Sequence, residues 1–231
     1  MRPKEIGENG FKNRIIKMNS VLLEILNKDV ANRHVFISNG NRKTGVIPSV
    51  SLLPVIDCGN CKICSHMCYD LRNDCFMNTV VATRATNSAI YRNDPQRYFD
   101  EIDAWLTINY PRAFRWHIGG DIKDAFYLEQ MIRIAEKFSD IKFLAFTKMF
   151  DLVNEYHERI PANLHIIFSG WVGQKMNNEF GFPSSHPLFA DGKTSAHDGA
   201  KLCTGNCTEC LKENRLCWNL GANEEVVFPV H

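Results

Sequence analysis

The sequence predicts an α/β fold, built as an incomplete or open (β/α) barrel with mostly parallel strands. Short runs of apolar and β-favouring residues alternate with segments of helical apolar spacing, which is the order that βαβ units produce. The chain has 231 residues, fewer than the roughly 250 of a complete eight-stranded barrel. We therefore expect a single α/β domain over residues 1–231 that carries cysteine-rich metal-binding loops.

The expected elements follow one another along the chain. A helix near 13–28 and a strand near 33–38, containing HVFIS, come first. Apolar spacing then predicts helices at 76–91, 95–109, 123–138 and 149–158. Strands are expected at 113–120, 141–148 and 163–171. Segment 172–202 is rich in Gly, Pro, Ser and Asn and is expected to be irregular. The terminal EEVVFPVH is expected to form an edge strand, because Pro229 has no N–H to donate.

Composition and charge limit the partners. The formal net charge is +1, which gives no electrostatic reason to expect a nucleic acid or a membrane surface. No segment approaches about eighteen uninterrupted apolar residues, and the N-terminal stretch lacks the continuous apolar region of a signal peptide. We expect a cytoplasmic protein whose partner is a small-molecule ligand or an electron donor.

The chain holds nine cysteines in two groups, CGNCKICSHMCYDLRNDC at 58–75 and CTGNCTECLKENRLC at 203–217. Nine cysteines cannot all pair within one chain, and the reducing cytoplasm opposes a disulfide framework. Metal or iron–sulfur ligation is therefore the leading interpretation of both groups.

The C-terminal group has a compact spacing. Three, two and six residues separate its members, which are Cys203, Cys207, Cys210 and Cys217. Zinc and iron–sulfur clusters can both take four thiolates. Many zinc sites use two CxxC pairs that are far apart in sequence, so one compact run favours a [4Fe–4S] cluster over the alternatives of zinc and structural thiols.

The first group has one thiol more than a four-coordinate centre needs. Its members are Cys58, Cys61, Cys64, Cys68 and Cys75. The spare thiol could ligate a second centre, stay a thiol, or take part in redox chemistry. His66 lies in the same loop, where a solvated histidine is favoured over a ligand because the thiols suffice.

Strand alternation predicts a polar cavity at the end of the barrel. Arg115 and His117 share one face of their predicted strand, opposite Phe114 and Trp116. If the corresponding faces of the next strands also point inward, Thr147, His165 and Ser169 join the same cavity. The carboxyl ends of the strands carry Gly119, Gly120, Asp121 and Lys148. Ligands bind at such ends in α/β proteins, whereas an internal hydrogen-bond network with a Gly-Gly-Asp turn is the structural alternative.

A cysteine-rich loop followed by a strand that ends in Gly119-Gly120-Asp121 resembles the radical S-adenosylmethionine enzymes. That resemblance implies a cluster in the first loop and an S-adenosylmethionine whose amino group is held after the strand. The spacing CxxCxxCxxxC of Cys58, Cys61, Cys64 and Cys68 departs from the pattern of those enzymes. The spacing of Cys203, Cys207 and Cys210 does match it, but lies at the other end of the chain.

Several short stretches resemble a phage-encoded family known as gene product eighty-eight. They are KTGVIPSVSLLP, CSHMCYD, RWHIGGD, FLAFTK, CTECLKENRLCW and VVFPVH, spread over residues 40–231. The resemblance implies a metal- or cluster-binding α/β protein, in the host cytoplasm if it is phage-encoded. It supports seven ligands, Cys58, Cys64, Cys68, Cys203, Cys207, Cys210 and Cys217, and gives less support to Cys61 and Cys75.

These observations lead to one functional hypothesis and one alternative. The hypothesis is an iron–sulfur protein with two [4Fe–4S] clusters and redox or radical S-adenosylmethionine-like chemistry, in which Arg115, His117, Thr147, Lys148 and Ser169 contact cofactor or substrate. The alternative is a zinc-stapled binding protein without enzymatic activity. The substrate and the oligomeric state do not follow from the sequence.

Overall fold

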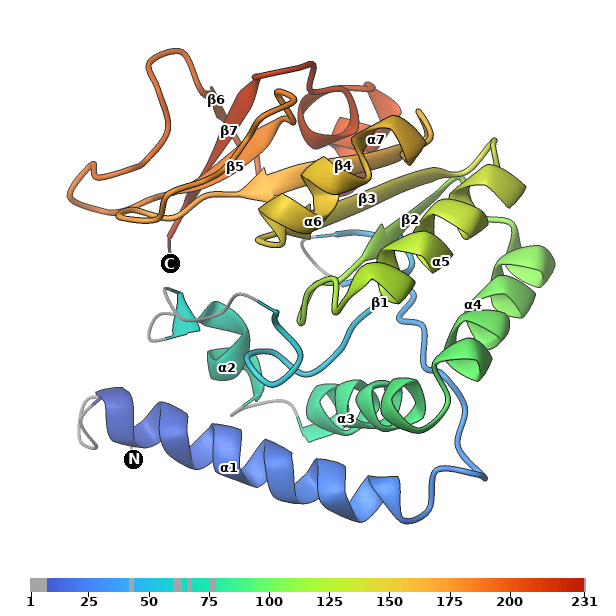
Figure 1. Ribbon diagram of the computed structural model, residues 1–231. Helices are drawn as coiled ribbons and strands as arrows, with labels where there is room; N and C mark the ends of the chain where they lie inside the picture. Colours follow the sequence, from blue (N-terminus) through green and yellow to red (C-terminus); the bar gives the residue numbers. More distant parts are fainter. Residues whose placement is uncertain (1–7, 42–43, 60–63, 66–67, 75–77, 231) are drawn as a thin grey trace. The chain divides into compact units, whose positions relative to one another are not determined.

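The computed structural model describes residues 8–41, 44–59, 64–65, 68–74 and 78–230 (Figure 1). The chain divides into two compact units. Unit 1 comprises Met1–Ile37, Val50–Tyr110 and His117–Asp121, and unit 2 comprises Ser38–Ser49, Pro111–Trp116 and Ile122–His231. Each unit is described by itself, and the expectation of a single domain stays a prediction. Among the described residues, every helix is too short or too polar to cross a membrane.

Unit 1 is a helical unit. Its helices are α1 (Glu8–Asn27), α2 (Tyr69–Asp74), α3 (Asn78–Asn93) and α4 (Pro95–Asn109). The small side chains of Ala85 and Ala89 on α3 pack against Leu23 and Leu26 of α1, which removes apolar surface from water. Helix α4 begins where the Asp94 side chain accepts a hydrogen bond from the Arg97 amide at 3.0 Å.

Unit 2 contains most of an open, parallel, seven-stranded sheet. Its strands run in the order β1-β2-β3-β4-β5-β7-β6. They are β1 (Ser49–Val50), β2 (Ala113–Trp116), β3 (Lys142–Thr147), β4 (Leu164–Ser169), β5 (Ser184–Leu188), β6 (Lys201–Leu202) and β7 (Glu225–Pro229). The α/β class and the parallel sheet predicted from the sequence are therefore confirmed, and the sheet does not close into a barrel.

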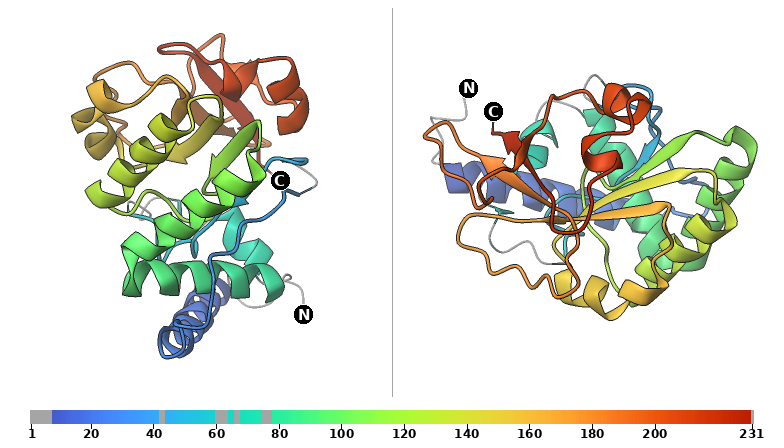
Figure 2. Two further views of the ribbon diagram at one scale, coloured as in Figure 1. Left: turned by 90° about the vertical axis from the view of Figure 1, so that its right-hand side faces the viewer. Right: turned by 90° about the horizontal axis from the view of Figure 1, so that it is seen from above.

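Helices α5 (Ala125–Lys137) and α6 (Phe150–Glu155) cover one face of this sheet (Figures 1 and 2). Trp116 meets Tyr127 of α5 edge-to-face with ring centroids 6.3 Å apart, and Phe150 of α6 packs on Phe168 at 4.9 Å. The short elements η3 (His157–Arg159), α7 (Cys207–Lys212) and η4 (Leu216–Trp218) complete unit 2.

The opposite face of the sheet holds a second apolar cluster. Leu144 and Ile167 lie on it, because successive strand residues point to opposite faces. Trp218, Leu220 and Val226 pack on these two residues from the C-terminal part of the chain. The C-terminal cysteine segment thus covers the face that α5 and α6 leave open.

The predicted strand at 33–38 is wrong. The amides of Val35 and Phe36 donate to the side chains of Glu101, at 2.7 Å, and Asn87, at 2.8 Å. Only Ser38 makes a β-bridge, an isolated antiparallel one with Ser49. Side chains of α3 and α4 therefore satisfy this segment in place of a neighbouring strand.

Two predictions for the C-terminal third also need correction. The segment 172–202, expected to be irregular, contains β5, a strand that holds Pro187 and Ser-Ser-His. Strand β7 is not at an edge, because it lies between β5 and β6. Its Pro229 is tolerated there since β6 pairs only with Val226 and Val227, so Pro229 lies beyond the end of β6.

Candidate metal centre

The four C-terminal cysteines lie on three short elements of unit 2. Cys203 follows β6, Cys207 and Cys210 belong to α7, and Cys217 lies in η4. The Cys203 amide donates to Val227 O at 2.9 Å, which continues the pairing of β6 with β7. Asn206 caps α7 by accepting from the Glu209 amide at 3.2 Å, and this fixes the start of the helix.

Packing places these thiols in an apolar environment. Cys210 is buried within the cluster formed by Leu144, Ile167, Trp218 and Val226. The other three cysteines are half-buried and pack against the same cluster. The Trp218 indole N–H donates to Cys207 O at 3.2 Å, which ties η4 to α7. The segment is thereby folded back so that thiols from α7 and η4 share one environment.

The thiols also act on one another electrostatically. Burial, followed by negative charge on Cys203, Cys207 and Cys210, raises the pKa of Cys217 to about 12. The Arg115 guanidinium acts in the opposite direction. Ionising several thiols against this apolar cluster would therefore require a compensating cation.

Polar groups already point at two of the sulfurs. The Gly205 amide donates to Cys203 Sγ at 3.4 Å, and Thr204 Oγ1 lies 3.6 Å from Cys210 Sγ. Within the described residues, however, no three Cys, His, Asp or Glu side chains stand in the geometry of a closed metal site. Thiols ligate a metal as thiolates, so metal binding at these residues would release their protons.

Part of the first cysteine group lies in unit 1. Burial and the charge of Asp70 raise the pKa of Cys68 to about 12, against the opposing effect of the Leu71 and Asp70 amides at the start of α2. The charge of Cys58 is the smallest of the causes that raise this pKa. Cys58 Sγ accepts a hydrogen bond from the Val55 amide at 3.3 Å. Cys64 is half-buried, whereas Cys61, Cys75 and His66 lie outside the described residues.

A buried ion-pair network that the sequence analysis did not predict supports α2. Arg84 of α3 contacts Asp70 at 3.1 Å and Asp74 at 3.0 Å, and all three side chains are almost inaccessible to solvent. Asn19 of α1 donates to Asp74 at 2.9 Å. The sequence signal for this network is a pair of acidic residues four positions apart on α2 and one arginine on α3. Charged residues at such spacing are also common on solvated helices, so the signal does not identify a buried network.

The predicted Gly-Gly-Asp turn lies on this network. A Cβ at Gly119 would stand 2.8 Å from Arg84 Cζ and 3.0 Å from Asp70 Oδ2. Gly120 has a φ of +84° and packs on Leu52. The Asp121 amide donates to Asp57 O at 3.1 Å, and Asp57 itself pairs with Arg92 at 2.7 Å. Gly119 is needed because a Cβ there would collide with Arg84 and Asp70. Gly120 is needed because its positive φ is strained for other residues.

The residues predicted to bind a cofactor are divided between the units. His117, Gly119, Gly120 and Asp121 belong to unit 1, and Arg115, Thr147, Lys148 and Ser169 belong to unit 2. His117 is buried and has a φ of +52° just after β2, and its amide donates to Val50 O at 2.9 Å. Strand β2 ends at Trp116, so His117 lies beyond it. The prediction that His117 shares a strand face with Arg115 is therefore wrong.

Within unit 2 the expected common face is wrong for Thr147. Arg115, Leu144 and His165 are cross-strand neighbours, so Arg115 and His165 share a face. Thr147 pairs with Phe168 and therefore lies on the face covered by α5 and α6. Its hydroxyl accepts from the Met149 amide at 3.0 Å and shapes the turn after β3. Burial, and then the charge of Lys142, lower the pKa of His165.

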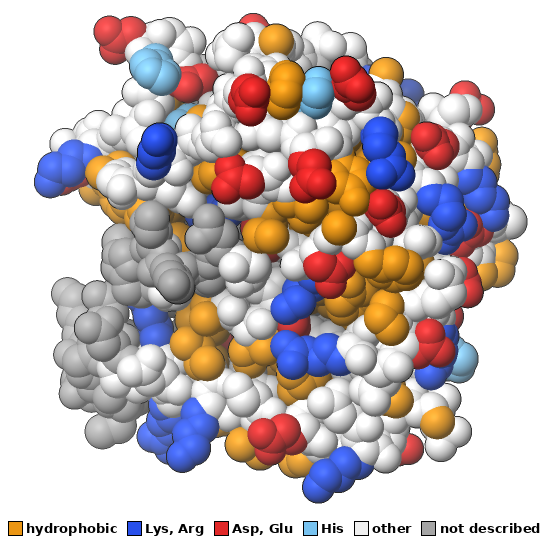
Figure 3. All heavy atoms as spheres, viewed as in Figure 1, with side chains coloured by type: hydrophobic (Ala, Val, Ile, Leu, Met, Phe, Trp, Pro, Cys, Tyr) orange, Lys and Arg blue, Asp and Glu red, His pale blue; other side chains and the backbone are white. Residues whose placement is uncertain are grey.

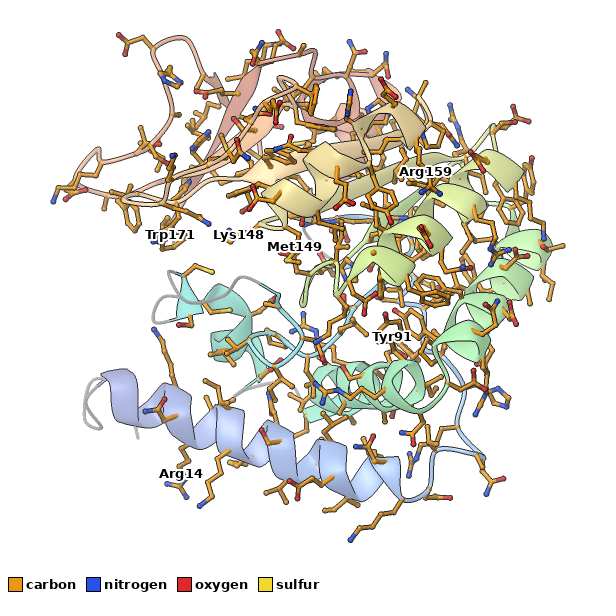
Figure 4. All side chains as sticks on the ribbon, viewed as in Figure 1. Arg14, Tyr91, Lys148, Met149, Arg159 and Trp171 are labelled. Carbon is orange, nitrogen blue, oxygen red and sulfur yellow. The ribbon has the colours of Figure 1, made fainter. Side chains whose placement is uncertain are left out.

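The carboxyl ends of β3 and β4 do bring two predicted residues together. Lys148 Nζ donates to Ser169 Oγ at 2.6 Å, and Figure 4 shows Lys148, Met149 and Trp171 at this end of the sheet. A buried histidine that the sequence analysis missed lies close by. His186 contacts Ser184 at 2.9 Å and Ser195 at 2.8 Å, and burial lowers its pKa.

The comparisons with known proteins give one match. The family described as Gene product 88 matches residues 26–180, which is more than half of the chain. The matched region includes Cys58, Cys64, Cys68 and the Gly-Gly-Asp turn, and it ends before the C-terminal cysteines. No curated protein and no solved structure matches the chain.

Proposed function

The chain belongs to the Gene product 88 family, and for this member we propose that the four C-terminal thiolates hold one inorganic centre, a [4Fe–4S] cluster. Its ligands would be Cys203, Cys207, Cys210 and Cys217. The observation that carries the proposal is the packing of these four cysteines, one buried and three half-buried, in or against one apolar cluster on one face of the sheet. A bound cluster would compensate the charge of thiolates, which is costly to bury in such an environment.

Electron transfer is the chemistry that this environment supports. A bound cluster would accept an electron from a donor and pass it on, while burial, N–H···S hydrogen bonds and nearby charge from the chain would set its reduction potential. The Gly205 amide at Cys203 and the Arg115 guanidinium near Cys217 are groups of the required kinds. The Arg115 guanidinium lies 5.0 Å from the centroid of the Phe146 ring. This cation–π contact keeps the positive charge on the sheet face that the C-terminal cysteine segment covers.

A second centre in unit 1 completes the hypothesis. Cys58 and Cys68 would belong to it; the charge of Cys58 raises the pKa of Cys68, and the backbone amides of Asp70 and Leu71 at the start of α2 lower it. With Cys64 and either Cys61 or Cys75 they would make a four-thiolate set. Radical S-adenosylmethionine chemistry would instead require only three of these thiolates to ligate the cluster, so that one iron stays open, with Asp121 after the glycine turn as the group for the cofactor amine. That chemistry stays a prediction.

Zinc is the second candidate, and the shortness of the elements favours it. Helix α7 has 6 residues and η4 has 3, so neither is stable without external support. Structural zinc contributes folding free energy to such segments. In this alternative the C-terminal segment is a zinc staple and the protein binds a partner without catalysis.

Anaerobic purification of the full chain separates these candidates. The proposal predicts a brown protein with about four irons per C-terminal cluster, or about eight with both, and matching sulfide. Serine variants of Cys207 and Cys210 should lose about half of the iron if two clusters form. A colourless protein with zinc and no sulfide would favour the staple. Reduction with S-adenosylmethionine and a search for 5′-deoxyadenosine then tests radical chemistry.

A further inference from the structure

A buried histidine of unit 2 lies between two serine hydroxyls. His186 is only 4% exposed; its Nδ1 lies 2.8 Å from Ser195 Oγ, and its Nε2 lies 2.9 Å from Ser184 Oγ. Ser184 and His186 point to the same face of β5, because they are two positions apart. Ser195 belongs to the loop that follows β5 and is half-buried. The imidazole therefore connects a strand of the sheet with a serine on a loop.

A neighbouring carboxylate decides which ring nitrogen of His186 carries the proton. Burial alone would raise the pKa of Glu225, but hydrogen bonds from the His197 amide and ring outweigh burial and lower it, so Glu225 is ionised at neutral pH and only accepts. The Ser184 hydroxyl donates to Glu225 Oε1 at 3.4 Å. Ser184 Oγ must then accept from His186 Nε2–H. Burial lowers the pKa of His186, so the ring is neutral and Nδ1 is left as an acceptor.

Ser195 is consequently the donor in its contact with His186. A neutral imidazole 2.8 Å from a serine hydroxyl is placed to take the hydroxyl proton, which is how serine nucleophiles are activated. Glu225 Oε1 reaches the imidazole through Ser184 and also lies 3.5 Å from His186 Nε2 directly. A carboxylate on the far side of the ring orients such a base. The three side chains thus have the roles of a nucleophile, a general base and an orienting acid.

The loop that carries Ser195 is held in place at both ends. The His197 amide and Nδ1 donate to Glu225 at 2.6 and 2.9 Å. On the other side of Ser195, the Phe189 amide donates to Lys193 O at 2.9 Å and closes a turn. Figure 3 shows charged side chains on the outside of this loop, at the upper left of the molecule. Glu225 therefore orients the base and also fixes the segment that carries the nucleophile.

The imidazole lies at the carboxyl end of β4. A Cβ at Gly170 would stand 2.5 Å from His186 Cε1 and Nδ1, so the ring packs directly on the backbone there. Lys148 Nζ donates to Ser169 Oγ at 2.6 Å, one residue before Gly170. The carboxyl ends of parallel strands form the edge at which α/β proteins bind ligands. A cation at this edge is the kind of group that stabilises an oxyanion.

We propose that Ser195 is a nucleophile that attacks the carbonyl carbon of a carboxylic ester, with His186 as its general base. His186 Nδ1 takes the Ser195 proton while Oγ bonds to the carbonyl carbon, and it then gives this proton to the alcohol that leaves. Water, deprotonated by the same nitrogen, releases the carboxylic acid from the acyl-serine and restores the hydroxyl. Ser184 and Glu225 are positioning residues that keep the other ring proton on Nε2. The activity goes beyond the proposed metal centre, because it uses other residues.

Labelling of the full chain with a fluorophosphonate tests this proposal, because this probe bonds covalently to activated serines. Mass spectrometry of the peptides should place a stoichiometric label on Ser195. Ser195→Ala should remove the label, and His186→Gln should slow labelling at least about 100-fold, since the general base is lost. The matched control is Ser185→Ala. It should leave the labelling rate unchanged, because the Ser185 hydroxyl points to the other face of β5 and donates to Phe168 O.

A second measurement tests acyl transfer itself and does not depend on the folding of the His186 variant. p-Nitrophenyl acetate should release a stoichiometric burst of p-nitrophenol from the wild type, with acetyl found on Ser195, and Ser195→Ala should give no burst. An unlabelled Ser195 in the wild type, or an equal labelling rate in a His186→Gln variant that folds by circular dichroism, would overturn the proposal. So would a label on Ser169, which would assign the nucleophile to the serine beside Lys148. Iron and sulfide content does not enter these readouts, so they stand whether or not the chain binds a cluster.

Discussion

At the scale of single residues, a glycine allows an arginine side chain to pack directly against the backbone. Gly119 leaves room for the Arg84 guanidinium, which two buried carboxylates hold. The sequence predicted a functional turn at Gly119, Gly120 and Asp121, but its close contact with Arg84 depends on packing that no local pattern reports. Cysteine spacing predicted that the C-terminal thiols lie together, and all four do share one apolar cluster; that they bind a metal stays a prediction.

Replacing Gly119 with alanine should destabilise the protein. The new methyl group would stand 2.8 Å from Arg84 Cζ, so the buried ion pair must shift. We expect a loss of about 1–3 kcal/mol in the free energy of unfolding, measured by urea denaturation. Gly221→Ala is the control, because its nearest atom lies at an ordinary 3.7 Å. An equal, small effect of both substitutions would contradict the tight contact at Gly119.

Arg84 itself should be more sensitive. Arg84→Met removes the partner of two buried carboxylates, Asp70 and Asp74, and leaves their charge uncompensated. A loss of about 3–5 kcal/mol is expected from the same measurement. The exposed Arg159, which contacts Glu129 at 3.4 Å, gives the control variant Arg159→Met, for which we expect less than about 1 kcal/mol. Similar losses in the two variants would argue against a buried network.

At the scale of elements, the sheet shows which patterns were informative. The runs at 113–120, 141–148 and 163–171 contain β2, β3 and β4, because parallel strands covered on both faces are rich in apolar residues. Strand β5 was missed since Ser184, Ser185, His186 and Pro187 do not resemble a strand. Its conformation comes from pairing with β4 and β7. Tertiary pairing thus overrides local preference.

The start of α5 provides a test at this scale. Asp124 accepts from the Tyr127 amide at 2.9 Å and caps the helix. Asp124→Ala should lower the free energy of unfolding by about 1 kcal/mol, whereas Asp124→Ser should restore most of it. Thermal or urea unfolding measures both variants. Equal losses in the alanine and serine variants would show that the hydrogen bond is not what stabilises the helix start.

Strand β7 gives a pH-dependent prediction. Burial opposes ionisation of Glu225, but the amide and ring of His197 outweigh it and lower the pKa of Glu225, while Glu225 raises the pKa of His197. A lowered carboxyl pKa stabilises the fold above the unfolded-state value near 4.5 and loses this effect as the pH falls through the folded-state pKa. A raised histidine pKa stabilises below 6.5 and is lost as the pH rises.

The free energy of unfolding should therefore differ most between wild type and Glu225→Gln from about pH 4.5 to 6.5, where both groups are charged. The difference should shrink on either side of this window. Urea denaturation across pH 3 to 9 measures it. A difference that stays constant with pH would show that Glu225 stabilises β7 through packing and not through its charge.

At the scale of the whole molecule, the sequence predicted the class of the fold but not the order of its sheet. The α/β alternation stops after β4, since β5 follows without an intervening helix and β7 inserts between β5 and β6. The C-terminal cysteine segment connects β6 to β7 and covers the sheet face opposite α5 and α6. Metal binding there should stabilise unit 2, because those connecting elements are short.

Removal of the proposed centre should consequently lower the melting temperature. Treatment of the anaerobic protein with a strong chelator is expected to reduce it by roughly 5 °C or more, because a ligand that binds only the folded state is lost. Scanning calorimetry before and after treatment gives the comparison. The control is the chain in which Cys203, Cys207, Cys210 and Cys217 are serine, whose melting temperature should fall less than that of the wild type, since only a centre in the first cysteine group could still be removed.

The most direct measurement of the central claim is thiol alkylation of the anaerobically purified chain, followed by mass spectrometry of each cysteine. The account predicts that Cys203, Cys207, Cys210 and Cys217 are protected together and become reactive together when the metal is removed. Cys203, Cys207 and Cys217 are only half-buried, so burial alone would not protect all four. Alkylation of these three before metal removal, at the rate found after it, would contradict a centre bound by all four thiolates.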